Sequence, residues 1–133
     1  MEHIVIIGNG ISGVTLARHI RKNSDKRITI ISEESEFFFS RTALMYVYMG
    51  HMKFEHTQPY ENSFWTENQI ELIKGTVTQI DFDQKQINLN NGNSLKYTTL
   101  ILAKEFEEIC LLGTVVHCFD EVYLFFCAYA TLL

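Results

Sequence analysis

The chain has 133 residues, of which 47% are hydrophobic and 13% aromatic, a composition typical of a globular domain and not of a disordered segment. Its formal net charge of −5 argues against a general affinity for nucleic acid or for an anionic membrane, because both attract cationic surfaces. The length suits one ordinary domain with a hydrophobic core.

The first third of the chain reads as strand, turn, helix and strand. Residues 4–7 are a continuous apolar run, which predicts a strand buried on both faces. A glycine-rich turn follows over residues 8–13, and then apolar residues at helical spacing predict a helix that ends near residue 23, where cationic side chains suit the helix dipole. Residues 28–31 predict a second buried strand. A βαβ unit of this kind requires a parallel strand pair with a right-handed crossover.

The remaining pattern predicts two short helices and then strands. A helix is expected over residues 42–49, with Ser40 or Thr42 near its cap, and another over residues 61–67. From residue 70 the pattern is that of strands, and "NNGNS" predicts a hairpin turn because Asn and Gly accept positive φ at low cost. Residues 98–103, "TTLILA", predict another buried strand. The fold class is therefore α/β, with a parallel sheet that starts with a βαβ unit and an inserted antiparallel hairpin or meander.

The turn after the first strand has the spacing G-x-G-x-x-G. Gly8 allows the sharp turn from strand into helix, Gly10 lets a pyrophosphate approach the backbone because it has no Cβ, and Gly13 lets the helix pack closely on the strand. The start of the helix, which includes Ile11 and Ser12, offers unpaired N–H groups to the phosphates. These residues predict a Rossmann-like dinucleotide site.

An acidic residue follows the second predicted strand at the position that such a site needs. Glu33 lies twenty residues after Gly13, where a carboxylate can accept hydrogen bonds from ribose hydroxyls. A carboxylate there would repel a 2′-phosphate, which disfavours NADP. On these residues alone the ligand is open between FAD and NAD, because both contain an ADP half. The alternative is a glycine-rich turn that holds no ligand, with Glu33 at the surface.

"IVIIGNGISGVTLARHIRK" with "ITIISEE" resembles the N-terminal FAD-binding segment of the pyridine nucleotide-disulfide oxidoreductase superfamily, near its NADH dehydrogenase, nitrite reductase and rubredoxin reductase type flavoproteins. "FFFSRTAL" resembles a family segment whose arginine region, here Arg41, lies along the flavin. "IELIKGTVTQIDFDQKQINLNNGNSLKYTTLILA" resembles a later run in which Val77 would meet the adenine and Ala103 would lead into a turn near FAD. The resemblance implies FAD as the cofactor and NAD(P)H as a co-substrate of the intact family.

The chain departs from the family pattern in two places. Leu44 and Met45 stand in the stretch where members often carry a Lys, and Lys104-Glu105 follow Ala103 where the family has Thr-Gly. No counterpart is recognised for the nicotinamide-binding domain, the second part of the FAD domain or the C-terminal domain. We therefore expect residues 1–103 to be the N-terminal part of a Rossmann-like FAD-binding domain. Residues 104–133 are expected to be a divergent apolar tail, as a truncated or frame-shifted reading would produce.

Other chemically interesting residues favour structural roles. His51 and His56 flank Glu55 but read as loop residues, so no metal site is predicted. Trp65 is expected in the core rather than over a flavin edge. For Arg41 a surface ion pair with a nearby glutamate is as well supported as a cofactor contact. Three cysteines in the last quarter have no metal-site spacing, which suits reduced thiols in the cytoplasm.

The sequence thus predicts the FAD-binding portion of an NAD(P)H-dependent flavoprotein oxidoreductase, in which hydride passes from nicotinamide to flavin and electrons go on to an unspecified acceptor. Whether the chain is itself an enzyme is left open, because the domains that would complete the cycle are not recognised. The alternatives are a small module that binds NAD or another adenine nucleotide without redox activity, and a nonfunctional fragment. The apolar tail is a candidate for self-association or a protein partner, and residues 122–133 are too few to span a bilayer.

Overall fold

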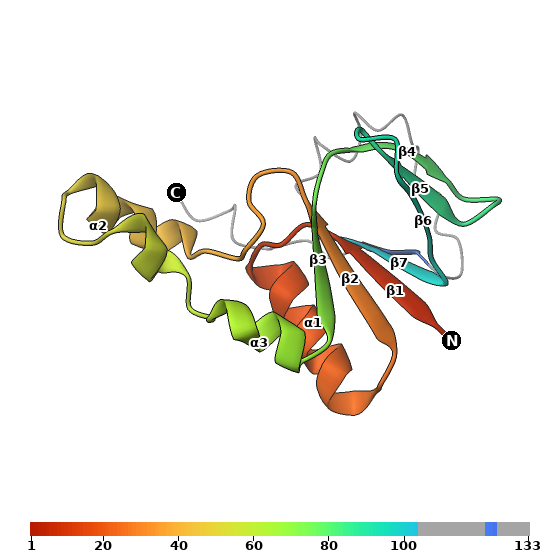
Figure 1. Ribbon diagram of the computed structural model, residues 1–133, viewed down its shortest axis with the longest axis horizontal. Helices are drawn as coiled ribbons and strands as arrows, with labels where there is room; N and C mark the ends of the chain where they lie inside the picture. The colour runs from red at the N-terminus through yellow and green to blue at the C-terminus, as the bar shows by residue number, and fades with distance from the viewer. Residues whose placement is uncertain (104–121, 125–133) are drawn as a thin grey trace.

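The computed structural model describes residues 1–103 and 122–124 of the chain. In this part, one sheet is parallel throughout with strand order β3-β2-β1-β7-β8, and a second, antiparallel sheet has the order β4-β5-β6 (Figure 1). The elements in chain order are β1 (His3–Ile7), α1 (Ile11–Asn23), β2 (Arg27–Ser32), the 3-10 helix η1 (Arg41–Ala43), α2 (Leu44–Tyr48), the 3-10 helix η2 (Phe54–Thr57), α3 (Asn62–Glu67), β3 (Ile70–Lys74), β4 (Val77–Asp81), β5 (Gln86–Leu89), β6 (Ser94–Lys96), β7 (Thr99–Leu102) and β8 (Val122–Leu124). The predicted fold class is confirmed.

The predicted βαβ unit is present with the expected geometry. β1 and β2 pair in parallel, with Ile4 opposite Ile28 and Ile7 opposite Ile31. α1 begins at Ile11 and ends at Asn23, with Arg21 and Lys22 in its last turn. The cations suit the partial negative charge at that end of the helix, as the sequence predicted.

The central strand of the parallel sheet, β1, is continuously apolar because a layer of apolar side chains packs on each face of the sheet. Ile4 and Ile6 belong to a core cluster with Val14 of α1 and Trp65 of α3. Val5 and Ile7 belong to a second cluster, which includes Val77, Ile87 and Leu89 of the antiparallel sheet. Successive side chains of a strand point to opposite faces, so a strand between two apolar layers shows no polar alternation. Figure 1 shows α1 and α3 on one side of the sheet and β4–β6 on the other.

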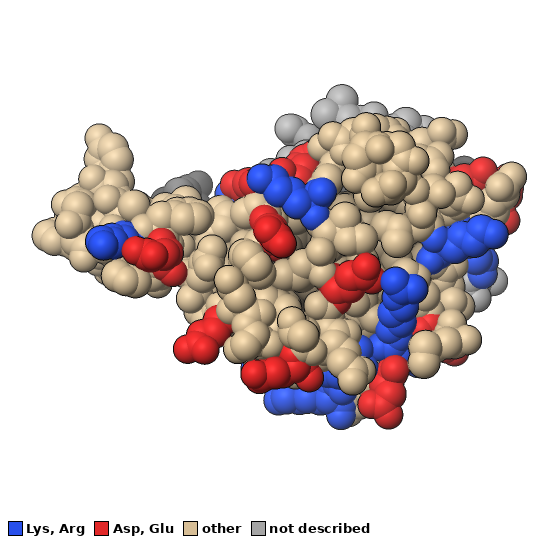
Figure 2. Space-filling model, in the orientation of Figure 1, with Lys and Arg blue, Asp and Glu red and all other residues tan. Residues whose placement is uncertain are grey.

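The segment between β2 and α3, which contains η1, α2 and η2 and is called the arm below, projects away from the two sheets (Figure 1). The helix predicted over residues 42–49 is wrong in its extent, because η1 precedes an α2 of only five residues. Ser40 is at the N-cap of η1 but makes no side-chain capping bond, and its hydroxyl lies 3.0 Å from that of Thr42. The arm exposes large apolar side chains, with Tyr48 94% exposed, and Figure 2 shows few charged residues on it. Because no residue of α2 is buried, no packing against the core stabilises a longer helix here.

The second half of the described chain supplies the outer strands. The short helix expected over residues 61–67 is confirmed as α3, and β3 joins the parallel sheet beside β2. The predicted hairpin is confirmed between β5 and β6, where Gly92 has φ +81°. β8 comes from the predicted tail and pairs in parallel with β7, so at least these three residues belong to the sheet. The rest of residues 104–133 lies outside the described residues, and so does any association through them.

Candidate functional site

The glycine turn lies at the carboxyl end of β1, where β1 passes into α1. Gly8 has φ +112°, a backbone conformation that a residue with a side chain rarely adopts. Its N–H donates to the carbonyl of Ile31 at 2.8 Å, which extends the pairing of β1 and β2 by one step. The strand therefore turns sharply into the helix while it stays attached to β2.

Gly13 is required by packing between α1 and β1. A Cβ at this position would lie 2.1 Å from the carbonyl oxygen of Gly8 and 3.3 Å from Cγ2 of Ile6. The first distance is far inside van der Waals contact, and the neighbour is backbone, which can shift only at a cost. Gly13 thus lets the first turn of the helix lie directly on the glycine turn.

Neither a positive φ nor close packing requires a glycine at Gly10. Its φ of −70° is ordinary for any residue, and a Cβ built on it would meet no atom of residues 1–103 or 122–124 within 4 Å. It occupies the N-cap of α1 without any side-chain capping bond, although Ser, Thr, Asn or Asp caps a helix better. The described residues give no reason for a glycine here, so the space left open beside Gly10 is the feature that points to a ligand.

The first turn of α1 presents unsatisfied donors to this space. The helical bonding begins with the N–H of Val14, which donates to the carbonyl of Gly10 at 3.0 Å. Among the described residues, the N–H groups of Ile11, Ser12 and Gly13 have no acceptor, and no acidic side chain lies in this turn. Such groups and the positive end of the helix dipole form a site for an anion such as a pyrophosphate.

The carboxyl ends of the neighbouring strands bring other predicted site residues to the same edge. Glu33 follows β2 directly and is exposed, and Ala103 follows β7. The N–H of Ala103 donates to the carbonyl of Ile7 at 2.8 Å, next to Gly8. Ligands of open parallel sheets bind at this edge of the strands. The structure therefore brings Gly8, Glu33 and Ala103 together around the start of α1.

The two other predicted residues lie on neighbouring elements. Val77 begins β4 and is buried in the second core cluster. Arg41 begins η1, forms an ion pair with Glu34, and lies with its Cζ 5.6 Å from the centre of the Phe39 ring. Of the two alternatives for Arg41, a cofactor contact and a surface ion pair, the structure contains the ion pair. Trp65 is 3% exposed and packs against Tyr60 and Phe64, which confirms its expected place in the core.

A residue that the sequence did not single out connects the two loops of this edge. The side-chain amide of Asn9 donates to the carbonyl of Ser35 at 2.8 Å, across from the glycine turn to the loop after β2. Asn9 is a variable position of the G-x-G-x-x-G pattern, so the motif alone gave no signal for it.

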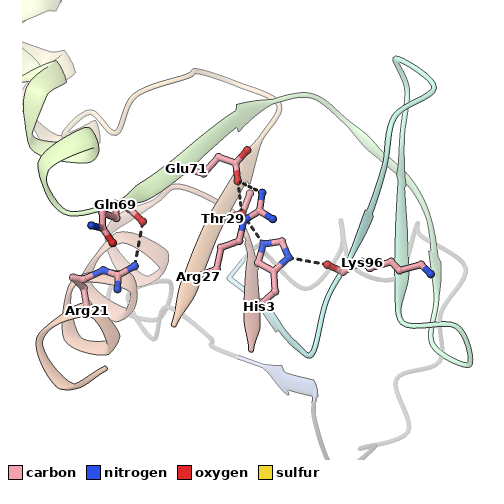
Figure 3. A network of polar contacts seen from close by, with 7 residues as sticks. All are labelled: His3, Arg21, Arg27, Thr29, Gln69, Glu71 and Lys96. Carbon is pink, nitrogen blue, oxygen red and sulfur yellow. Dashed lines mark hydrogen bonds and ion pairs between the residues drawn. The ribbon is translucent and has the colours of Figure 1, made fainter. Parts of the chain in front are cut away.

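The main ionisable network lies at the opposite, amino-terminal edge of the sheet (Figure 3). His3 Nδ1 donates to the carbonyl of Lys96 at 2.8 Å, and its Nε2 lies 2.8 Å from the hydroxyl of Thr29. That hydroxyl donates to Glu71 at 3.0 Å, and Arg27 donates to the same carboxylate oxygen at 2.9 Å. Since β1 runs from His3 toward Gly8, this network is structural and lies away from the candidate site.

The network shifts the pKa of His3 and the pKa of Glu71. Burial lowers the pKa of His3 below its ordinary value, and its bond to the Lys96 carbonyl only partly opposes this. Burial raises the pKa of Glu71, but the hydrogen bonds from Arg27 and Thr29 outweigh burial, so the pKa of Glu71 lies below its ordinary value.

Three further findings about the described residues bear on function. A shallow hollow beside α1 and α3 is lined by Arg18, Arg21, Lys22, Phe64 and Asn68, at the end of α1 away from the glycine turn. Within residues 1–103 and 122–124, no group of three or more His, Cys, Asp or Glu side chains is arranged to hold a metal ion. None of the helices described has both the length and the apolar character that crossing a bilayer requires.

Sequence comparison gives one family and several curated relatives. Residues 2–108 match the family described as "Pyridine nucleotide-disulphide oxidoreductase". The chain is 30% identical over 104 residues to the benzene 1,2-dioxygenase system ferredoxin–NAD(+) reductase subunit of Pseudomonas putida, which covers 77% of this chain and 25% of that protein. It is 34% identical over 111 residues to an NADH oxidase of Methanocaldococcus jannaschii, covering 74% of this chain and 24% of the oxidase. The chain thus spans about a quarter of the length of the curated relatives it matches.

Structural comparison gives the same kind of protein. The NADH:rubredoxin oxidoreductase of Clostridium acetobutylicum superposes with a TM-score of 0.71 at 27% identity, over 77% of this chain and 27% of that one. The sulfide:quinone oxidoreductase of Aquifex aeolicus superposes with a TM-score of 0.70 at 28% identity, over 78% of this chain and 24% of that one.

Proposed function

Because the chain belongs to the pyridine nucleotide-disulphide oxidoreductase family, we propose that residues 1–103 are the FAD-binding part of an NAD(P)H-dependent flavoprotein oxidoreductase. FAD and NAD(P)H are the cofactors of this family. When bound, FAD supplies a flavin that accepts hydride from a nicotinamide and passes electrons on. The residues of this chain bind and orient the ADP half of that cofactor.

The observation that carries this proposal is the open space at Gly10. Gly8 is explained by its positive φ and Gly13 by its contact with Gly8, whereas Gly10 has ordinary φ and no described neighbour within 4 Å of a Cβ. Beside Gly10, three N–H groups have no acceptor among the same described residues, and this combination fits a pyrophosphate that approaches the backbone closely. The residues present therefore fit the diphosphate of FAD.

The remaining site residues have roles that follow from their places. Glu33 accepts hydrogen bonds from the ribose hydroxyls, because it follows β2 at the edge where α1 starts. Val77 supplies backbone groups to the adenine, and Ala103 lies against the end of β1. Arg41 contacts the cofactor only after its ion pair with Glu34 opens, which the exposed positions of both side chains allow.

The whole reaction needs more than this part of the chain. The proposed activity includes an NAD(P)H site and an electron acceptor, and the ferredoxin–NAD(+) reductase relative suggests a ferredoxin-type protein as that acceptor. Three cysteines with no metal-site spacing support a reducing, cytoplasmic location as part of the same proposal.

Titration of the purified chain with FAD, NAD and ADP in one buffer tests the proposed function. We expect FAD to bind most tightly, with a flavin absorbance spectrum that stays with the protein through gel filtration. NAD or ADP binding more tightly than FAD would favour the alternative, a small adenine-nucleotide module. No binding of any of the three would contradict both functions.

Glu33→Arg tests the ribose contact. We expect FAD affinity to fall by about 1–3 kcal/mol, because a hydrogen bond to a charged acceptor is replaced by a group that cannot accept. Glu36→Arg, a change of an exposed glutamate in the same loop, is the matched control for the added charge. Equal affinities for the Glu33→Arg variant and the unchanged chain would remove Glu33 from the ribose site.

A further inference from the structure

The side chain of Asn9 connects the two loops between which the ADP half is proposed to lie. Its Nδ2 donates to the carbonyl of Ser35 at 2.8 Å and lies 3.5 Å from the Ser35 hydroxyl. That hydroxyl donates to the carbonyl of Phe37 at 2.8 Å, so it braces the same loop. Both Asn9 and Ser35 are half-buried, which protects these bonds from competition by water.

Glu33 is held between two backbone anchor points in this arrangement. On its amino side, the carbonyl of Ser32 accepts from the N–H of Gly75 at 2.8 Å. On its carboxyl side, the carbonyl of Ser35 accepts from Asn9. The first anchor belongs to the strands β2 and β3, whereas the second depends on one side chain. Loss of the Asn9 amide therefore removes the hydrogen bond that connects the carboxyl side of this segment to the glycine turn.

We infer that Asn9 is a positioning residue, which fixes the loop after β2 so that the Glu33 carboxylate meets the ribose 2′-hydroxyl of an ADP-containing ligand. This inference rests on the proposed function, because it requires a ribose beside Glu33. Asn9 itself touches no part of the ligand in this account. Its contribution is to selectivity for the hydroxyl, since a carboxylate that is held in place loses less conformational entropy when it accepts that hydrogen bond.

The test compares the affinities for ADP and 2′-deoxyADP, two ligands that differ only in the hydroxyl that Glu33 is proposed to accept from. By calorimetry the unchanged chain should bind ADP about tenfold more tightly than 2′-deoxyADP, the size of one charge-assisted hydrogen bond. Asn9→Ala should bring this ratio close to one, and Glu33→Gln should do the same. In the double variant the ratio should not fall further, because both changes remove the same contact.

Asn68→Ala is the matched control, since the Asn68 amide donates to the carbonyl of Phe64 at 2.7 Å, on α3 and away from the ribose. It should leave the ratio unchanged. If Asn9→Ala lowers both affinities equally, as a general loss of structure would, the ratio stays unchanged. An unchanged ratio in this variant would overturn the inference. An unchanged chain that binds both nucleotides equally would overturn it as well. If the unchanged chain binds neither ADP nor FAD, the proposed function itself fails.

Discussion

At the scale of single residues, the three glycines of one motif have three different physical causes. Gly8 is fixed by a positive φ, Gly13 by the carbonyl oxygen of Gly8 2.1 Å from its missing Cβ, and Gly10 by no contact within the part of the chain that the structure describes. The sequence motif predicted three roles, namely the turn at Gly8, the approach of a pyrophosphate at Gly10 and helix packing at Gly13. The structure adds the physical measure of each role, because it shows the backbone angles and what surrounds each Cα.

The first residue-scale prediction contrasts Gly13 with Gly10. Gly13→Ala should lower the free energy of unfolding by about 1–3 kcal/mol, because the new methyl group meets backbone that can shift only at a cost. Gly10→Ala should change it by less than about 1 kcal/mol, because only the quality of the N-cap changes. Urea denaturation of the two variants measures both values. Equal losses of stability would contradict the different causes assigned to these glycines.

Arg41 illustrates the limit of sequence at this scale. The sequence supported a cofactor contact and a surface ion pair equally, and the structure contains the ion pair with Glu34. Which of the two contacts Arg41 makes depends on the conformation of the segment after β2. The spacing of residues in a sequence motif does not specify that conformation.

At the scale of elements, the sequence predicted local structure well where burial decides it. β1, α1 and β2 lie within a residue or so of their expected bounds, because continuous apolar runs predict the two buried strands and the glycine turn separates the first strand from the helix. The helix expected over residues 42–49 was right in place but wrong in extent, because the arm is exposed and no packed face stabilises a longer α2. The pairing of β3 with β2 was not predictable from periodicity, since it joins segments separated by the whole arm.

One element-scale prediction concerns the end of α1. Arg21 donates to the carbonyls of Ser24 at 3.2 Å, Lys26 at 2.8 Å and Gln69 at 3.1 Å, and so joins α1, the loop before β2 and the residue before β3. Figure 3 shows the bond to Gln69. Arg21→Lys should lower the free energy of unfolding by about 1–2 kcal/mol, because a lysine cannot reproduce the planar fork.

The neighbouring cation on α1 is the control for Arg21. Lys22 is exposed, so Lys22→Ala should change stability by no more than about 0.5 kcal/mol. Thermal and urea denaturation of both variants measure the difference. A loss as large for Lys22→Ala as for Arg21→Lys would mean that positive charge at the helix end, and not the three hydrogen bonds, provides the stability.

A second element-scale prediction concerns pH and the network that joins β1, β2 and β3. The folded chain holds the pKa of His3 below its ordinary value of about 6.5, so the unfolded chain binds more protons just below that pH. Stability should therefore fall as pH falls from about 6.5 through the lower pKa of the folded state. Glu71 acts in the same direction at lower pH, because its folded pKa is also depressed and its contribution is present only above that range.

Urea midpoints between about pH 8 and pH 4 measure this acid dependence. Glu71→Gln should reduce the loss below about pH 5, whereas Glu67→Gln, a change of an exposed residue on α3, should not. A profile that is flat in the unchanged chain, or unaffected by Glu71→Gln, would show that the network does not couple protons to folding.

At the scale of the whole molecule, the structural network and the candidate binding site lie at opposite edges of the parallel sheet. The amino edge carries the His3 network and the carboxyl edge carries the glycine turn, Glu33 and Ala103. Helices on one face and the antiparallel sheet on the other bury the strands that hold these edges apart. This layered arrangement was predictable as a fold class, whereas the comparisons add that the chain spans about a quarter of the length of the reductases it matches.

The central claim is that the first turn of α1 binds a diphosphate, and amide chemical shifts test it most directly. In ¹⁵N–¹H spectra recorded during titration with ADP, the largest shifts should come from the amides of Ile11, Ser12 and Gly13, and Gly10→Val should abolish them while the spectrum stays that of a folded protein. Shifts that are absent, that gather at the hollow lined by Arg18 and Lys22, or that persist unchanged in Gly10→Val would contradict the account.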